Sequence, residues 1–339
     1  MIKHQEKQKK QDLGIFYTPP EVVSFVFDVL NIWKEKEDKE KKRWQSRQPK
    51  AHYPSVIDSA VGEGIFLKKA VESGFTKPDW VFGADIDERA VQRWKEINLL
   101  AEFGGKEDDL EAHFFHQNGL LNVQWDQHKE KYKGKLRPDN IERQQFDVAV
   151  GNPPYGGIGV DFESKKTPEV LELLKALEKY EIFFHKKANN GKQVEANEQN
   201  SLFAKSEVSV RQGSVGINEV GRLAQGMPIE ILFVERFIQL VKPGGWIAVI
   251  IPDGILSNSN AHYVRDFIAA KAKVEAIVSL PRETFKQAGT SAKTSILFLR
   301  KLVENEAPPL NHQVFLATAD KISKDDFQKI AKDYINFYQ

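Results

Sequence analysis

The run FDVAVGNPPY, residues 146–155, joins a buried-strand pattern to an abrupt stop. Residues 146–150 are apolar and rich in β-formers, which predicts a buried parallel strand. Pro153 and Pro154 then fix their own φ angles and bias the residue before each of them to extended geometry, so the chain after the strand is rigid. Open α/β sheets bind ligands at the carboxyl ends of their strands. The sequence therefore predicts a ligand platform at this strand end.

The platform presents groups that suit a flat substrate with an exocyclic amine. The Asn152 side chain and the Pro153 carbonyl can accept two N–H bonds, and the Tyr155 ring offers a face for stacking. An Asn-Pro turn followed by a core tyrosine explains the same residues without any ligand. These four residues alone do not decide between the two interpretations.

The composition is that of a soluble globular protein. The chain has 339 residues, 41% of them hydrophobic and 29% charged, which allows one large domain or two ordinary ones. No apolar run approaches the roughly 20 residues that a membrane helix needs. The first ten residues, MIKHQEKQKK, also lack the apolar segment of a signal peptide. We therefore expect a cytoplasmic protein without membrane contact.

Charge and cysteine content exclude several kinds of site. The net charge is +1, from 49 basic and 48 acidic residues, so nucleic-acid binding would have to rest on a local patch. The chain contains no cysteine, which excludes disulfides, thiolate zinc sites, iron–sulfur clusters and a cysteine nucleophile. We expect no metal site.

A loop of aromatics leads into a helix near the N-terminus. Thr18 is a predicted N-cap, Pro19 fits the first turn, and Glu21 completes a capping box. The apolar residues of 22–30 recur at helical spacing. The mixed-charge stretch 34–50 predicts a helix end and a solvated linker.

A strand, a glycine turn and a helix begin the predicted sheet. The strand covers 55–60 and leads through Gly62 and Gly64, where the backbone can approach a ligand closely, into a helix. The spacing is G-x-G-x-F and departs from the dinucleotide fingerprint G-x-G-x-x-G, which argues against a nicotinamide cofactor. A glycine turn without a ligand is the alternative.

Polar residues end the next two predicted strands. The strand at 80–87 carries Asp85, placed to accept hydrogen bonds from ribose hydroxyls, and Asp87, predicted to cap the following helix. The strand at 113–117 ends at Asn118, where a side chain could meet a base edge. The predicted strand order places Asp85 and Asn118 on the same edge of the sheet as Gly62 and Asn152. Each residue alone has an ordinary explanation, but all of them occurring together at one edge is much less expected by chance.

The second half of the chain continues the α/β pattern after an insertion at 160–228. An amphipathic helix at 168–187 leads into a polar run. This run fits a lid or binding loop and a plain solvated surface equally well. A helix at 231–241, a buried strand at 246–252 and a helix at 260–270 follow.

The last two predicted strands, 274–281 and 294–300, are joined by a loop too short for a crossover helix, so they should pair antiparallel. That loop places Phe285 among basic residues, as stacking on a base and holding phosphate would require. These residues are Arg282, Lys286 and Lys293.

Together these residues resemble amino-group DNA methyltransferases that use S-adenosylmethionine, over roughly residues 11 to 302. The similarity is greatest to the modification subunits of type I restriction systems and related N6-adenine methylases. The resemblance implies a catalytic motif formed by Asn152, Pro153, Pro154 and Tyr155. The cofactor-binding residues that it implies are Phe16, Tyr17, Thr18, Pro19, Asp58, Gly62, Gly64, Phe66, Asp85, Asn118 and Asn152. Tyr155 and Phe285 would hold a flipped base, with Arg282, Lys286 and Lys293 beside the DNA.

The resemblance also implies an architecture. We expect a Rossmann-like class I methyltransferase fold, with a mostly parallel seven-stranded sheet and a terminal antiparallel strand. The expected parts are an N-terminal motif, helix and linker (1–50), a catalytic domain (51–302) and a C-terminal tail (303–339). No target recognition domain is recognisable after residue 302, so the expected partners are DNA and a separate specificity subunit or a missing recognition domain.

The expected function is methylation of adenine N6 in DNA, within a restriction-modification or related defence system. Two other interpretations stay open. The same platform serves enzymes that methylate a glutamine amide or an RNA base, and the chain could be a non-catalytic cofactor-binding subunit of a DNA-binding complex. Adenine rather than cytosine rests on the resemblance alone.

Overall fold

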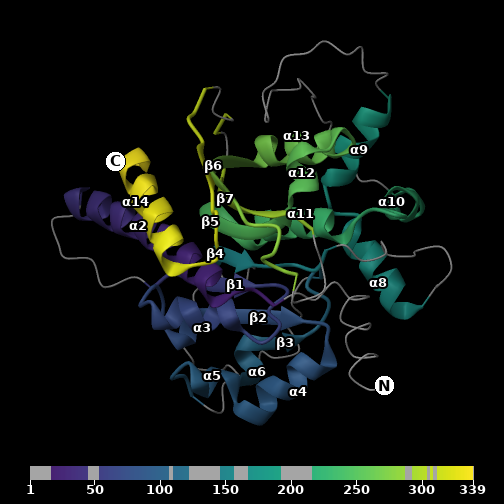
Figure 1. Cartoon of the computed structure of the whole chain (residues 1–339). Helices are drawn as coiled ribbons and strands as arrows, with labels where there is room; N and C mark the ends of the chain where they lie inside the picture. Colours follow the sequence, from purple (N-terminus) through teal and green to yellow (C-terminus); the bar gives the residue numbers. More distant parts are fainter. Residues whose placement is uncertain are drawn as a thin grey trace.

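One mixed β-sheet forms the centre of the protein (Figure 1). The computed structural model describes residues 17–44, 53–106, 110–121, 146–155, 167–191, 216–286, 292–303, 306–307 and 311–338. Its eight strands are ordered β3-β2-β1-β4-β5-β7-β6-β8. They are β1 (Val56–Asp58), β2 (Val81–Asp85), β3 (Phe114–His116), β4 (Phe146–Gly151), β5 (Val241–Pro252), β6 (Ala272–Ser279), β7 (Thr294–Lys301) and β8 (Phe315–Thr318).

The predicted α/β methyltransferase-like sheet is confirmed, with two differences. β7 is antiparallel to β5 and to β6, as its short connection requires, but it lies between them and not at an edge. The sheet also has an eighth strand, β8, which pairs parallel with β6. β8 was not predicted because its residues alternate between half-buried and exposed and lie in the segment that the sequence sets apart as a tail.

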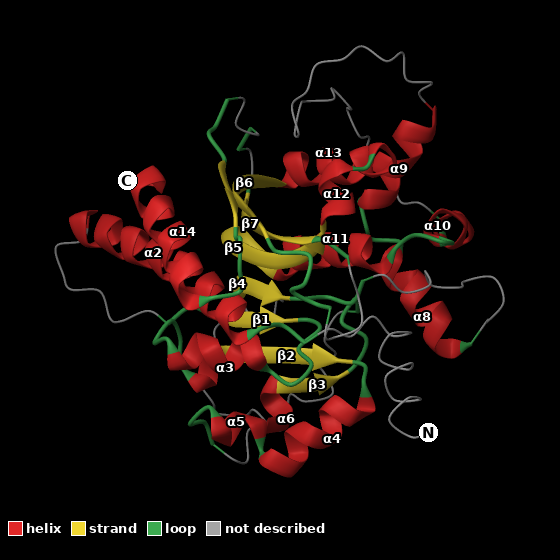
Figure 2. Ribbon diagram, viewed as in Figure 1, coloured by secondary structure: helices red, strands yellow, loops and turns green. Residues whose placement is uncertain are grey.

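Helices cover both faces of the sheet, as Figure 2 shows. Because both faces are covered, the central strands are mostly apolar, and every residue of β4 is buried, Asp147 included. One core joins the sheet to α2 (Pro20–Trp44), α3 (Ile65–Glu72), α4 (Glu88–Ile97), α5 (Leu99–Glu102) and α14 (Lys324–Tyr338). The other joins it to α8 (Pro168–Leu177), α9 (Ile182–Gly191), α10 (Ile217–Ala224), α11 (Ile229–Leu240), α12 (Asp253–Ser257) and α13 (His262–Lys271). A short helix, α6 (Leu110–His113), precedes β3.

Helix boundaries differ from the sequence prediction in two places. The helix predicted at 168–187 is two helices, α8 and α9, separated at residues 178–181. α2 begins at Pro20, and the Thr18 hydroxyl accepts a hydrogen bond from Asn152 Nδ2 (3.1 Å) where the sequence predicted a helix cap. Asp87 does cap α4, because its Oδ1 accepts from the Arg89 N–H.

The first and last described helices, α2 and α14, lie side by side at one end of the molecule (Figure 1). The Trp33 indole N–H donates to the Tyr334 hydroxyl, and both side chains are buried. Phe25 stacks on Phe327 with ring centroids 5.0 Å apart. Among the helices that the structure describes, none combines the length and apolar character needed to cross a bilayer.

Candidate cofactor and active site

A cavity of about 510 Å³ opens where β1, β2, β3 and β4 end. This volume lies within the range of about 300–1,000 Å³ that is usual for small-molecule sites. Four loops, each following one strand of the parallel part of the sheet, contribute to its wall. The predicted residues that line it are Tyr17, Thr18, Asp58, Gly62, Phe66, Asp85, Asn118, Asn152 and Pro154.

The two glycines of the first loop have different tasks. Gly62 has φ +51°, and a Cβ added there would meet nothing within 4 Å, so the backbone borders open space. Gly64 has φ +81° at the start of α3 and does not line the cavity. An added Cβ at Gly64 would lie 2.9 Å from Leu99 Cδ2. Gly62 therefore allows a ligand to approach, whereas Gly64 allows α3 and α5 to pack closely.

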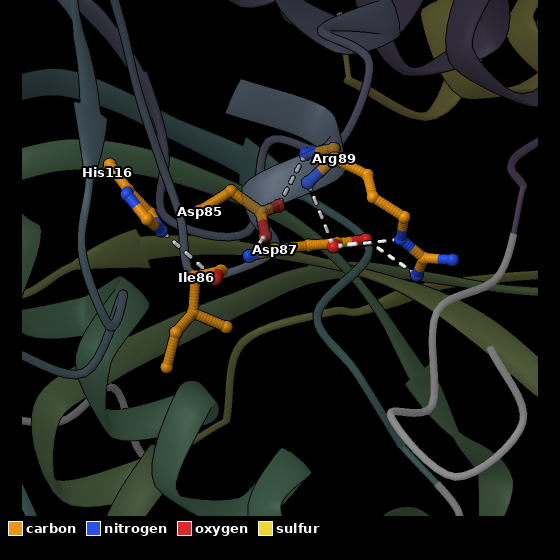
Figure 3. A network of polar contacts seen from close by, with 6 residues as sticks. Asp85, Ile86, Asp87, Arg89 and His116 are labelled. Carbon is orange, nitrogen blue, oxygen red and sulfur yellow. Dashed lines mark hydrogen bonds and ion pairs between the residues drawn. The ribbon is translucent and has the colours of Figure 1, made fainter. Parts of the chain in front are cut away.

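Asp85 closes the end of β2 and accepts two backbone hydrogen bonds (Figure 3). Gly62 N–H donates to Oδ2 at 2.7 Å, and Asp87 N–H donates to Oδ1 at 2.9 Å. Burial raises the pKa of the Asp85 carboxyl above its ordinary value, and these two donors oppose that rise. The carboxylate is thus fixed in orientation at the cavity wall, with lone pairs still available to a ligand.

Asp58 is the most deeply buried acid of the cavity wall. It is 1% exposed, and its Oδ1 accepts from the Ala60 N–H at 2.9 Å. Burial, with a smaller contribution from the charge of Asp85, raises the pKa of Asp58 to about 8, and the Ala60 N–H opposes this rise. A Cβ added at Gly151 would lie 2.6 Å from Asp58 Oδ1, so β4 approaches this carboxyl closely. A cationic ligand beside Asp58 would favour its ionised form.

The turn after β3 forms the next part of the wall. Asn118 Oδ1 accepts from the Leu120 N–H at 3.0 Å, which fixes the side chain against its own turn. Gly119 lies directly against Ser59, because an added Cβ would be only 1.7 Å from the Ser59 carbonyl oxygen. The first and third loops can meet at this point only because position 119 has no side chain.

Asn152 lines the cavity directly after β4. Its Nδ2 donates to Thr18 Oγ1, and Thr18 is 3% exposed. The N-terminal motif and the predicted catalytic motif, 134 residues apart in sequence, are thereby joined by one hydrogen bond. Pro153 and Pro19 do not line the cavity. Phe16 lies outside the described residues.

Tyr155 and Phe285 lie next to each other, but neither is open to solvent. Their exposed fractions are 0% and 1%, and their rings meet edge to face with centroids 6.1 Å apart. Burial raises the pKa of the Tyr155 phenol. The structure thus brings together Tyr155 and Phe285, the two residues predicted to hold a base. Both also belong to the hydrophobic core that joins the sheet to α2 and α14.

The basic residues around Phe285 divide into two kinds. Arg282 and Lys286 are exposed. Lys293 lies 3.8 Å from Asp253 Oδ2, while the Ser295 hydroxyl donates to the other Asp253 oxygen at 2.7 Å. Lys293 therefore has a carboxylate partner within the protein.

Several cavity residues were not predicted from the sequence. The Tyr17 hydroxyl donates to the carboxylate of Glu63 at the cavity wall. Ile86, at 62% exposure, follows the predicted acid and lies close to it in Figure 3. Others come from helices, among them Arg89 and Arg93 from α4 and Ile229 and Phe233 from α11. The i, i+4 spacing of Arg89 and Arg93 would have been the available signal for α4, whereas α11 is buried on nearly all sides and offers no such signal.

Two family models match separate parts of the chain. The N-6 DNA Methylase model matches residues 214–337, and the Eco57I restriction-modification methylase model matches residues 79–202. They fall on the two halves of the sheet that meet between β4 and β5.

Curated relatives match over short stretches. The chain is 34% identical over 90 residues to "Defense against restriction protein B" of Escherichia phage P1, covering 26% of this chain and 4% of that protein. It is 31% identical over 153 residues to "Type II methyltransferase M.VspI" of Vibrio sp. (strain 343), covering 43% of this chain and 26% of that protein. The matched stretches thus span only a small part of each relative.

Solved structures share the fold over nearly the whole chain. The type I restriction-modification methyltransferase subunit from Streptococcus thermophilus aligns with TM-score 0.56 and 16% identity, covering 95% of this chain and 53% of that chain. A class I S-adenosylmethionine-dependent methyltransferase from Listeria monocytogenes aligns with TM-score 0.52 and 19% identity, covering 95% and 72%. The resemblance predicted from the motifs is confirmed: models of N-6 DNA methylases and of restriction-modification methylases match separate parts of the chain, and solved methyltransferase structures share its fold.

Proposed function

We propose that this chain is an S-adenosylmethionine-dependent methyltransferase that modifies the N6 amino group of adenine in DNA. We also propose that it acts in the cytoplasm as the modification component of a restriction-modification or related defence system. The observation that carries the proposal is the hydrogen bond from Asn152 Nδ2 to Thr18, which joins the predicted catalytic platform to the wall of the cavity.

The cavity residues fit a nucleoside ligand with a charged tail. Gly62 leaves room for close approach, and Asp85 offers oriented carboxylate oxygens suited to ribose hydroxyls. Asn118 lines the wall where a base edge would lie, and Asp58 lies where a cationic group would favour its ionised form. When bound, S-adenosylmethionine supplies the methyl group that is transferred.

The catalytic work of the chain is to position the target amine. A base in a duplex must leave the stack to reach such a site. The Asn152 side-chain oxygen and the Pro153 carbonyl accept hydrogen bonds from the amino group and draw its nitrogen towards tetrahedral geometry, so that its lone pair becomes available. Tyr155 stacks on the base and Phe285 packs at its edge. This is catalysis by positioning and electrostatics.

The partners belong to the same proposal. The chain spans about half the length of the type I methyltransferase subunit with which it aligns. We propose that DNA recognition comes from a specificity subunit or from a recognition domain outside this sequence. Exposed Arg282 and Lys286 are the proposed phosphate contacts, and Lys293 would contribute less because Asp253 already pairs with it.

The test is nucleoside mass spectrometry of DNA from cells that express the chain, beside cells that express Asn152→Ala. We expect N6-methyladenine with the intact chain and a loss of about 10²–10³-fold in turnover for the variant, typical of removing one well-placed polar group. The affinity of the purified variant for S-adenosylhomocysteine should stay within about threefold, since Asn152 contributes only one side chain to the cavity wall.

Three outcomes would redirect the proposal. Equal loss of ligand binding and turnover in Asn152→Ala would contradict the catalytic role of this residue. Methylation of RNA or of a glutamine amide, with DNA unmodified even beside a specificity partner, would replace DNA as the substrate. A chain that binds the cofactor and modifies none of these would be a non-catalytic subunit.

A further inference from the structure

The turn 118–121, which lines the cavity through Asn118 and Gly119, receives hydrogen bonds from two buried side chains. These are Tyr180, in the insertion, and Arg236, on α11. The Tyr180 hydroxyl donates to the Leu120 carbonyl at 2.9 Å. Arg236 on α11 donates through Nε to the Gly119 carbonyl at 3.0 Å and through Nη2 to the Leu121 carbonyl at 2.6 Å.

The backbone carbonyls of residues 119, 120 and 121 thus each accept a hydrogen bond from a side chain outside the turn. Within the turn, the Leu120 N–H donates to Asn118 Oδ1 and the Leu121 N–H donates to the Asn118 carbonyl, while the neighbouring Gln117 Nε2 donates to the Leu121 carbonyl at 3.4 Å. Buried carbonyls without partners are costly, so the external donors decide which conformation the turn adopts. Tyr180 and Arg236 are 2% and 3% exposed, so water cannot readily replace them.

The same helix also forms part of the cavity. Ile229 and Phe233 of α11 line it, and Arg236 continues their i, i+4, i+7 row towards the turn. A Cβ added at Gly119 would lie 3.3 Å from Phe233 Cε1, so the helix packs tightly on the turn. One face of α11 thus lines the cavity and also holds the neighbouring 118–121 turn in place.

We propose that Tyr180 and Arg236 are positioning residues for the nucleoside end of the ligand: they hold the 118–121 turn in its binding conformation before the ligand arrives. This inference rests on the proposed function, because it takes Asn118 and Gly119 as part of a cofactor wall. Neither residue lines the cavity, so each acts through the turn. A turn ordered in advance binds more tightly because the ligand does not have to order it.

The test compares Tyr180→Phe with Tyr263→Phe. Tyr263 is a buried tyrosine, 7% exposed, in the same hydrophobic cluster, and it does not line the cavity. We expect Tyr180→Phe to raise the dissociation constant for S-adenosylhomocysteine about tenfold, in line with the loss of one ordering contact. Tyr263→Phe should leave the constant within about twofold, with a similar change in melting temperature.

Two further readouts separate positioning from folding. The KM for S-adenosylmethionine should rise in Tyr180→Phe while kcat at saturating cofactor stays within about twofold, because the ligand then orders the turn. Hydrogen exchange at the Leu120 and Leu121 amides should be faster in the free variant and return to the wild-type rate when ligand is bound. A loss of folded protein would lower kcat and leave the KM unchanged.

Arg236→Lys sharpens the test, because one ammonium group cannot match the fork of a guanidinium that reaches two carbonyls. We expect a weaker affinity than in Tyr180→Phe, with far-ultraviolet circular dichroism as the check on folding. Wild-type affinity in both variants would overturn the positioning role and leave the proposed function intact. If the wild-type protein did not bind S-adenosylhomocysteine, the proposed function would itself be overturned, and this inference with it.

Discussion

The two halves of the candidate site meet at Asn152 and differ in what fills them. The cofactor half is a cavity of about 510 Å³, with backbone N–H groups already directed at the Asp85 and Asp58 carboxyl groups. In the base half, Tyr155 and Phe285 lie edge to face and are fully buried. One half is open and offers hydrogen-bonding groups, whereas the other is occupied by its own aromatic rings.

This difference indicates how each half is stabilised. A cofactor wall made of glycine turns and capped carboxylates keeps its shape through hydrogen bonds, so it can remain open without a ligand. An apolar pocket for a base exposes aromatic surface when empty, and packing its rings together removes that surface from water. We therefore expect the nucleoside ligand to bind without rearrangement, and a flipped base to enter only when the Tyr155–Phe285 contact is separated.

Phe285→Ala should produce the largest effect and break the base half alone. Truncating a buried phenylalanine costs about 3–5 kcal/mol in the free energy of unfolding. Phe75→Ala is a matched control, because Phe75 is also fully buried and packs on another ring, Phe27, at 5.6 Å. Urea denaturation should show similar losses for the two variants, and both should keep the affinity for S-adenosylhomocysteine. Turnover on DNA should fall only in Phe285→Ala; a parallel loss of cofactor affinity there would show that the halves are not separate.

Gly119→Ala should break the cofactor half alone. The new Cβ would fall 1.7 Å from the Ser59 carbonyl, so the two loops must move apart. We expect about a hundredfold weaker binding of S-adenosylhomocysteine, or about 2.7 kcal/mol. Gly221→Ala is the control, since an added Cβ there lies 3.7 Å from its nearest neighbour and the residue is helical. That variant should bind normally and gain about 0.5–1 kcal/mol in stability. Normal binding by Gly119→Ala in calorimetry would exclude the turn from the wall.

The smallest effect concerns pH and the charge of the cofactor half. Burial raises the pKa of Asp58 to about 8, so the free protein holds a proton there at neutral pH. A cationic ligand favours the carboxylate and releases this proton, so the affinity for S-adenosylmethionine should rise about tenfold from pH 7 to pH 9 and then level off. Calorimetry in phosphate and in Tris measures the proton released. Asp58→Asn should remove this dependence; its persistence would assign the titration to Asp85, whose pKa burial also raises.

The sequence predicted those parts of the protein in which one signal dominates. The strand before Asn152 was found because it is apolar and ends at two prolines, and Asp85 because an acid follows a buried strand and precedes a capped helix. The order of these strand ends then placed the cavity residues on one rim. Local patterns were sufficient there because the sheet itself brings strand ends together.

Other features depend on packing that the sequence does not display. α11 is buried on nearly all sides, so no apolar face distinguishes Ile229 and Phe233 as cavity residues. β8 joins the sheet although Leu316 is 68% exposed, because its pairing with β6 decides its structure. Phe285 was expected to be available to a base because charged residues surround it in sequence, yet its ring is buried against Tyr155.

The contact between α2 and α14 has a consequence for the synthesis of this protein. Trp33 and its partner Tyr334 are 301 residues apart. At a translation rate of about 5–20 residues per second, Trp33 is made roughly 15–60 s before the helix that covers it. During that interval the apolar side of α2 must be shielded by other contacts or by a chaperone. A nascent chain stalled before residue 324, the start of α14, should therefore bind holdase chaperones more strongly than one that has released that helix.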